Sequence, residues 1–206
     1  MRTTVPIHPA HPSTVFFPAG DEYVISDTTL CSTGFAVTSS TGQDGFVSSG
    51  HCGATGDVVQ TANGTPIGTF AASDFPGTDF SWVSTNPYFV GDATVSRHDG
   101  TAAPVRGAAP APVGTPVCMS GKASGWRCGK ITATNQTVQY DQGLVGGLTA
   151  TTVCSDAGDS GGAFLSGDQA QGITSGGIGD CTSHGFTYFQ PIVPTLHAYG
   201  LTLRTD

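Results

Sequence analysis

Short strand-like segments, each followed by a cluster of turn-forming residues, run along the whole of this chain and limit the folds that it can adopt. The segments are rich in valine, threonine, phenylalanine and tyrosine, which favour strands. Glycine, proline, asparagine or serine separates them, as in antiparallel barrels and sandwiches. The clearest segments are residues 23–25, 34–37, 45–48, 57–60, 80–83, 137–140, 149–153 and 185–190. The sequence therefore predicts an all-β fold.

Only one segment has the pattern of a helix of any length. Residues 191–199 begin with a proline, place Ile192, Leu196 and Tyr199 at helical spacing, and are followed by Gly200. Composition agrees, because glycine supplies 30 of the 206 residues and only 11% of residues are charged. We expect strands and turns with one short helix near the C-terminus.

A stretch of small residues and prolines, residues 106–114, separates two parts of similar length. Its composition is typical of a connection between units. We predict a flexible N-terminal tail over residues 1–14, an N-terminal β-barrel over residues 15–107 and a C-terminal β-barrel over residues 108–206. The first residues lack the basic-then-apolar pattern of a secretory signal, which favours a mature form.

Charge and hydropathy argue against two classes of partner. The formal net charge of −8 leaves no basic patch to neutralise a phosphate backbone. No apolar run approaches the roughly 18 to 20 residues that a membrane-spanning helix needs. We expect neither a nucleic acid nor a membrane as a partner.

Six cysteines in a lysine-poor, glycine-rich chain predict disulfides and an oxidising compartment. Spacing alone leaves about 15 pairings open. The simplest of these joins sequence neighbours, as Cys31–Cys52, Cys118–Cys128 and Cys154–Cys181. No Cys-x-x-Cys pair is present, so neither a zinc site nor any other metal or cofactor is predicted.

The pentapeptide Gly-Asp-Ser-Gly-Gly at residues 158–162 is the clearest chemical signal in the chain. A serine hydroxyl is a weak nucleophile that needs an adjacent base. Glycines around it let a substrate carbonyl approach backbone N–H groups that a side chain would block. Ser160 is therefore a candidate nucleophile.

Two upstream fragments offer the base and the carboxylate that such a serine needs. His51 lies in Ser-Gly-His-Cys, and Asp79 comes directly before an apolar strand-like segment. The resulting order along the chain is His51, Asp79, Ser160. That is the order of the chymotrypsin-type catalytic triad.

Several longer fragments extend this similarity over nearly the whole chain. They are residues 49–52, 75–80, 125–129, 154–162, 172–177, 185–191 and 198–200. In this order they resemble the secreted bacterial serine proteases of the streptogrisin and alpha-lytic protease type. The resemblance implies a chymotrypsin-like fold of two antiparallel six-stranded β-barrels with a short C-terminal helix, and it implies the three neighbouring disulfides.

The resemblance also implies roles for individual residues. His51 is expected to be the general base, Asp79 its orienting carboxylate and Ser160 the nucleophile, with the N–H groups of Gly158 and Ser160 as the oxyanion hole. Ser175 resembles the serine that supports the buried aspartate. The implied substrate-binding residues are Ser155, Asp156, Ala157, Thr174, Ser175, Gly176, Gly177 and Phe186.

Two positions depart from the family pattern. Met119 stands where relatives often carry an arginine that neutralises the residue matching Asp159, so Lys122, Arg127 or an N-terminal amine is left to do so. Phe186 stands where relatives have a smaller residue, and we expect it to shorten the specificity pocket. Asp156 either faces solvent or lies on the pocket rim, where it selects against acidic substrates.

These observations favour a secreted, extracellular serine endopeptidase that forms an acyl-enzyme intermediate and prefers a large or medium apolar residue before the cleaved bond. We expect a monomer whose partners are protein or peptide substrates and proteinaceous inhibitors. A second hypothesis is a catalytically impaired binding module on a protease scaffold. A third is an α/β-hydrolase esterase, because Gly-x-Ser-x-Gly also fits the nucleophile elbow of that fold.

Overall fold

The computed structural model describes residues 13–26 and 28–206, so the predicted tail over residues 1–14 lies almost wholly outside it. The first half contains the strands β1 (Val15–Ala19), β2 (Glu22–Ile25), β3 (Thr29–Ser32), β4 (Ala36–Ser39), β5 (Asp44–Ser48), β6 (Val58–Gln60), β7 (Pro66–Asp74), β8 (Phe80–Thr85), β9 (Phe89–Ser96) and β10 (Ala102–Pro104). The second half contains β11 (Pro116–Gly121), β12 (Gly125–Tyr140), β13 (Gly143–Thr151), β14 (Ala163–Ser166), β15 (Gln169–Ile178), β16 (Phe186–Pro191) and β17 (Leu201–Leu203). Every strand-like segment predicted from the sequence overlaps one of these strands.

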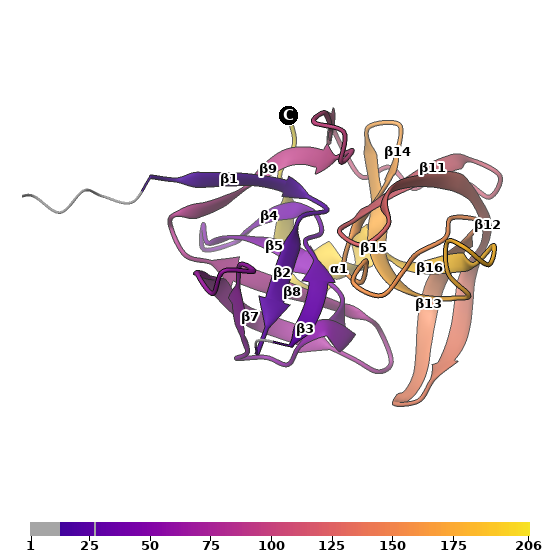
Figure 1. Cartoon of the computed structure of the whole chain (residues 1–206), viewed down its shortest axis with the longest axis horizontal. Helices are drawn as coiled ribbons and strands as arrows, with labels where there is room; N and C mark the ends of the chain where they lie inside the picture. The colour runs from indigo at the N-terminus through magenta and orange to yellow at the C-terminus, as the bar shows by residue number, and fades with distance from the viewer. Residues whose placement is uncertain (1–12, 27) are drawn as a thin grey trace, which may run out of the picture.

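The strands of the second half close into a six-stranded barrel, in the order β11-β12-β13-β16-β15-β14. Seven strands of the first half, joined by β17 from the second, form an eight-stranded sheet in the order β17-β4-β5-β8-β7-β6-β2-β3, and β1-β9-β10 form a separate sheet. Figure 1 shows the two groups side by side, with the β12–β13 hairpin extending away from the second. The all-β prediction of two barrel-like sheets is confirmed, although the first has eight strands and not the predicted six, and an α/β-hydrolase is excluded.

Two pairings could not be read from the sequence. β1 runs parallel to β9, whereas the other strand pairs are antiparallel. β17, at the end of the second half, pairs with β4 of the first, with Leu201 opposite Ser39. The division of the chain at residue 107 stays a prediction.

One α-helix, α1 (Ile192–Tyr199), is present among the described residues, as predicted. Pro191 precedes it, and Gly200 ends it in the left-handed conformation at φ 63°. Pro194 lies in the first turn, where its missing N–H costs no helical hydrogen bond. Within residues 13–26 and 28–206, no helix is long and apolar enough to cross a membrane.

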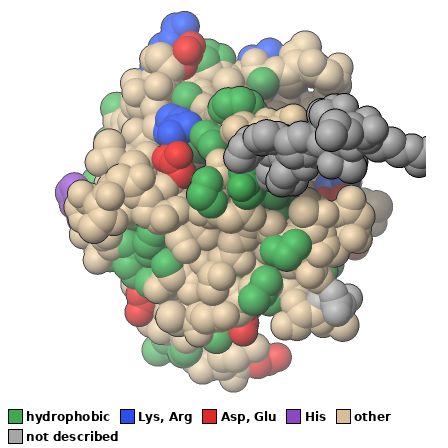
Figure 2. Space-filling model, turned by 90° about the vertical axis from the view of Figure 1, so that its left-hand side faces the viewer, with side chains coloured by type: hydrophobic (Ala, Val, Ile, Leu, Met, Phe, Trp, Pro, Cys, Tyr) green, Lys and Arg blue, Asp and Glu red, His purple; other side chains and the backbone are tan. Residues whose placement is uncertain are grey.

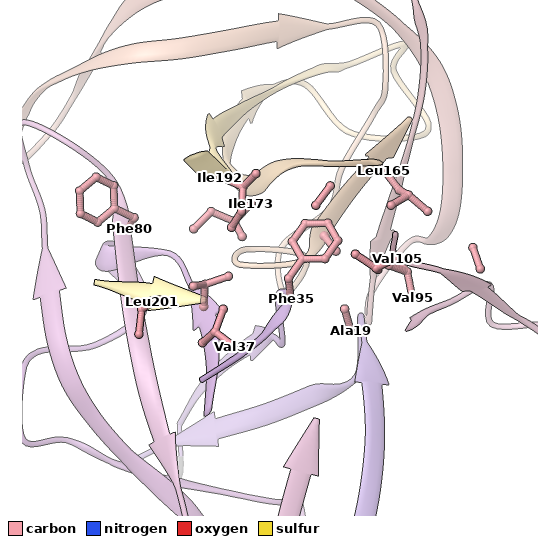
Figure 3. Packing of buried hydrophobic residues seen from close by; sticks show 14 residues of the cluster. Ala19, Phe35, Val37, Phe80, Val95, Val105, Leu165, Ile173, Ile192 and Leu201 are labelled. Atoms are coloured by element: carbon pink, nitrogen blue, oxygen red, sulfur yellow. The ribbon is translucent and has the colours of Figure 1, made fainter. Parts of the chain in front are cut away.

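Three apolar clusters hold the fold together. One lies inside each sheet system, and the third joins the halves through Phe35 and Val37 of the first and Leu165, Ile173 and Ile192 of the second. Figure 3 shows this junction cluster, in which the Phe35 ring points toward Ile173 and Leu165. Because these side chains are excluded from water, the two halves meet through a continuous core.

Disulfides join Cys31 to Cys52, Cys118 to Cys128 and Cys154 to Cys181, as the sequence predicted. The first ties β3 to η1 (Gly50–Cys52), the 3-10 turn that carries His51. The surface carries few charged side chains, and Figure 2 shows neutral polar and apolar groups over most of one face.

A partly buried carboxylate, that of Asp21, lies near His98, Lys122 and Glu22. Burial raises the pKa of Asp21, an effect that the charges of His98 and Lys122 reduce and that of Glu22 reinforces. A raised pKa in the folded state means that Asp21 favours folding only at low pH, and that this contribution is lost as the pH rises through the folded-state pKa. We expect Asp21→Asn to raise the unfolding temperature at pH 7 by a few degrees.

Thermal unfolding of both proteins between pH 3 and pH 8 tests this expectation. The increase in unfolding temperature should disappear below about pH 3.9, the ordinary pKa of aspartate, because the wild-type carboxyl is then neutral like the amide of the variant. A gain of equal size at pH 3 would show that the charge of Asp21 is not its cause.

Candidate active site

Asp79 and His51 form the centre of the site. Asp79 precedes β8 and is fully buried. His51 Nδ1 lies 2.8 Å from Asp79 Oδ2 and 3.1 Å from Oδ1, and the His51 backbone N–H donates to Oδ1 at 3.0 Å. A carboxylate only accepts hydrogen bonds, so Nδ1 carries the proton. In the neutral ring Nε2 is then left with a free lone pair.

Two further groups hold Asp79 in place. Ser175 Oγ donates to Asp79 Oδ2 at 2.5 Å, and the Asp79 N–H donates to Gln190 Oε1 at 3.0 Å. The support of Asp79 by Ser175 was predicted from the resemblance. Gln190 was not predicted, because it lies on β16, far from Asp79 in the sequence.

A tyrosine extends this network to the β12–β13 hairpin. Tyr140 Oη lies 2.9 Å from Ser175 Oγ. Since the single hydroxyl proton of Ser175 goes to Asp79, Tyr140 is the donor. Burial raises the pKa of Tyr140, which agrees with a hydroxyl that keeps and donates its proton. The ring of Phe75 stands edge-on to both His51 and Tyr140, with centroids 5.7 Å and 5.9 Å away.

The segments that carry His51 and Ser160 meet at one backbone carbonyl. Thr174 O accepts a hydrogen bond from the Gly161 N–H at 2.9 Å and another from the Ser49 hydroxyl. Gly161 has φ 83°, and a Cβ there would lie 2.0 Å from Ser48 Oγ. Only glycine fits at this position, which explains its place directly after the serine.

Gly158 turns the chain toward Ser160 at φ 106°. Its N–H and that of Ser160 donate to no acceptor among residues 13–26 and 28–206. Two such N–H groups on one tight loop are typical of donors to a ligand oxygen.

Asp159, between these two residues, is fully buried, and among the described residues its carboxylate accepts only from backbone N–H groups. Oδ1 accepts from Ala123 and Ser124, each at 2.9 Å, and Oδ2 accepts from Asp156 at 2.8 Å. Several N–H donors can stabilise a buried carboxylate without a counter-ion.

No Lys or Arg of the described residues forms an ion pair with Asp159, and the N-terminal amine that was also considered lies outside residues 13–26 and 28–206. Lys122 Nζ lies 3.4 Å from Glu22 instead, and the side chain of Arg127 is exposed. Met119, where the resemblance led us to expect an arginine, is fully buried in the barrel cluster. The prediction that Lys122 or Arg127 neutralises Asp159 is wrong, because amides take that place.

We expect Asp159→Asn to lower the free energy of unfolding by about 2 kcal/mol or more, because the new NH2 group faces N–H donors. Denaturant unfolding measures this loss. Asp141→Asn makes the same chemical change on an exposed residue and should alter stability by less than about 0.5 kcal/mol. Equal effects of the two variants would contradict the amide support of Asp159.

A cavity of about 220 Å³ opens beside Ser160. Its lining consists of Ser155, Asp156, Ala157, Ser160, Thr174, Gly176, Gly177 and Gly179. Phe186 is not among them, because its ring packs against Tyr188 with centroids 5.5 Å apart. The expectation that Phe186 shortens this cavity is therefore not supported.

Asp156 lies at the cavity and not in open solvent. Its Oδ1 accepts the Cys181 N–H at 3.2 Å, which holds the side chain there. The hydroxyl of Ser155 accepts from Thr187 at 2.9 Å, and that of Thr174 donates to Gly162 O at 3.1 Å. The cavity wall is therefore small and mostly neutral, with one carboxylate.

No group of three His, Cys, Asp or Glu side chains in residues 13–26 and 28–206 is placed to hold a metal ion. The arrangement instead offers a hydroxyl, a buried carboxylate–imidazole pair and unpaired N–H groups. Together these are the components of acyl transfer.

Comparisons with known proteins agree with this chemistry. Residues 17–196 match the family model described as Trypsin. Streptogrisin-C of Streptomyces griseus is 47% identical over 187 residues, which are 91% of this chain and 41% of the relative. The chain thus spans about two fifths of that relative's length.

Two solved structures are similar over their whole length. Protease A of Thermobifida fusca has a TM-score of 0.88 and 46% identity, and covers 93% of this chain and 100% of its own. Cellulomonas bogoriensis chymotrypsin has a TM-score of 0.86 and 48% identity, with the same coverage. The chain belongs to the trypsin family, and is similar to the streptogrisins and other chymotrypsin-like serine proteases of bacteria.

Proposed function

We propose that this protein is a serine endopeptidase in which Ser160 is the nucleophile, His51 the general base and Asp79 the orienting carboxylate. The observation that carries the proposal is the buried Asp79 carboxylate on His51 Nδ1, at 2.8 Å. It fixes the tautomer in which Nε2 can accept a proton. Membership of the trypsin family supports the same reaction.

In the proposed reaction, Ser160 Oγ attacks the carbonyl carbon of the scissile peptide as its proton passes to His51 Nε2. The carbonyl π electrons move to oxygen, and the N–H groups of Gly158 and Ser160 stabilise that oxyanion. His51 then returns the proton to the departing amine, which leaves an acyl-enzyme. Water, deprotonated by His51, hydrolyses the ester and restores Ser160.

The edge of β15 offers a place for the substrate backbone. β14 pairs with β15 only up to Ile173, whereas β16 pairs with it as far as Ile178. The residues from Ser175 to Gly177 therefore have one unpaired edge, beside the cavity at Ser160. An extended peptide added to this edge would place its side chains alternately toward the cavity and toward solvent.

We further propose that an apolar side chain before the cleaved bond enters the 220 Å³ cavity. The hydroxyls of Ser155 and Thr174 already bond to protein groups. No Lys, Arg or His lines the wall, so no cation is available for an acidic side chain. The carboxylate of Asp156 would repel an acidic side chain.

Asp156→Asn is expected to raise kcat/KM for substrates with glutamate before the cleaved bond, relative to leucine, by about 5- to 10-fold. The reason is the loss of about 1 kcal/mol of repulsion between two partly solvated carboxylates. Paired peptide substrates that differ only at this residue measure the ratio. Asp141→Asn should leave it unchanged, and an unchanged ratio in Asp156→Asn would remove Asp156 from substrate selection.

Three disulfides and the streptogrisin relatives support an extracellular location. Secretion is therefore part of the proposal. The monomeric state and the binding of proteinaceous inhibitors stay predictions.

Labelling with a fluorophosphonate probe near pH 8, followed by peptide mapping, tests the proposal. We expect the adduct on Ser160, and none in His51→Ala. Absence of an adduct on folded, disulfide-intact protein would instead favour the catalytically impaired binding module.

A further inference from the structure

Ser32, the last residue of β3, bonds to the second half of the chain through its backbone N–H and its hydroxyl, and is fully buried. Its N–H donates to Ser160 O at 2.8 Å. Its hydroxyl donates to Gly158 O at 2.8 Å and accepts the Lys122 N–H at 2.9 Å. No polar group of this side chain is left for another role.

The partners of Ser32 are the two residues whose N–H groups are proposed to bind the oxyanion. The carbonyl and the N–H of Gly158 belong to consecutive peptide groups, which are joined at the Gly158 Cα. Gly158 has φ 106°, in a region that glycine enters freely and leaves freely. Because the glycine backbone alone does not hold one conformation, a hydrogen bond to the Gly158 carbonyl limits the conformations of this loop.

The turn between β11 and β12 connects Ser32 to Asp159. Three consecutive N–H groups of this turn point to the same region: that of Lys122 donates to Ser32, and those of Ala123 and Ser124 donate to Asp159. The Ser32 hydroxyl thus links the turn that holds Asp159 to the carbonyl directly before Asp159. One hydroxyl therefore bonds both to the Gly158 loop and to the turn whose N–H groups hold Asp159.

We propose that Ser32 is a positioning residue for the oxyanion hole: its hydroxyl keeps Gly158 in the conformation whose N–H faces the substrate carbonyl oxygen. Ser32 acts through Gly158 and does not itself contact the substrate. The inference rests on the proposed function.

Ser32→Ala tests the proposal, with Ser120→Ala as its matched control. Ser120 is also fully buried, donates to Ser96 O at 2.7 Å and accepts from His98 Nε2 at 3.0 Å, and so also joins the two halves. Its side chain bonds to neither Gly158 nor Asp159. Both variants lose one donated and one accepted hydrogen bond.

We expect Ser32→Ala to lower kcat by about 10-fold or more while KM changes by less than about threefold. Removal of a whole oxyanion donor costs about 10² to 10³ in kcat, and a misplaced donor should cost part of that. A peptide aldehyde, whose hemiacetal oxygen occupies the oxyanion hole, should bind more weakly by a similar factor. The corresponding peptide alcohol, which places no such oxygen there, should bind unchanged.

Ser120→Ala should keep kcat within about twofold of wild type. The proposal is overturned if Ser32→Ala keeps wild-type kcat, if it weakens the aldehyde and the alcohol equally, or if Ser120→Ala loses as much. If Ser32→Ala does not fold, Ser32→Cys replaces it, because a thiol is too weak and too long a donor to keep the 2.8 Å bond to Gly158 O. Wild-type kcat and aldehyde binding in Ser32→Cys would equally overturn the proposal.

The wild-type protein separates this inference from the proposed function. If wild type neither hydrolyses peptides nor is labelled at Ser160, the proposed function fails. If wild type is active and Ser32→Ala is equally active, only the role of Ser32 fails.

Discussion

Replacement of Ser160 by alanine is expected to lower kcat by about 10⁶-fold, the largest effect of any single substitution in this protein. The alanine has no oxygen to form the acyl-enzyme, so only unassisted attack by water remains. His51→Ala should cost about as much, because without the imidazole the hydroxyl proton has no acceptor. The double variant should lose little more, since the two residues act as one unit.

Hydrolysis of a peptide anilide measures these losses, with KM as a second readout. Both variants should bind substrate nearly as well as wild type, because the cavity and the β15 edge are unchanged. Ser166→Ala, which removes a hydroxyl bonded to Pro116 O, is a control that should retain full activity. Hydrolysis by Ser160→Ala at more than about a thousandth of the wild-type rate would place the nucleophile elsewhere.

Asp79→Asn is expected to lower kcat by about 10⁴-fold near pH 7. Asp79 now accepts hydrogen bonds from His51 Nδ1 and Ser175 Oγ on one oxygen and from the His51 backbone on the other. An amide can offer only one acceptor oxygen. Where its NH2 group faces Nδ1, the ring proton moves to Nε2, and His51 can no longer accept a proton from Ser160.

KM and the unfolding transition distinguish this effect from misfolding. A wrong tautomer lowers kcat but leaves KM and the unfolding transition close to those of wild type. Asp141→Asn should show neither change. A loss below about tenfold in Asp79→Asn would mean that the carboxylate is not needed to orient His51.

The sequence predicted the parts of this molecule that depend on local chemistry. Glycine and proline clusters mark the ends of strands because few other residues adopt the turn conformations, and the helix at residues 191–199 is bounded by Pro191 and Gly200 for the same reason. The neighbouring cysteine pairs were the simplest of the possible pairings, and all three are present.

Contacts between distant segments could not be predicted in this way. Tyr140 and Gln190 reach the Asp79 network through strand register, which no residue pattern specifies. We expected a cation beside Asp159, because charged residues can be identified in a sequence. The backbone N–H groups that bind Asp159 cannot, because every residue except proline has one. Phe186 was placed at the cavity by its position in the chain, yet its ring packs against Tyr188.

The pairing of β17 with β4 affects how resistant the protein should be to proteolysis by other molecules of the same protein. β17 forms one edge of the eight-stranded sheet of the first half, so neither half can unfold alone without breaking contacts of the other. Unfolding should then occur as one cooperative event, with few partly opened forms. A peptidase cuts chains mainly when they open, so under the proposed function the resistance of this protein to self-digestion should follow how often it unfolds completely.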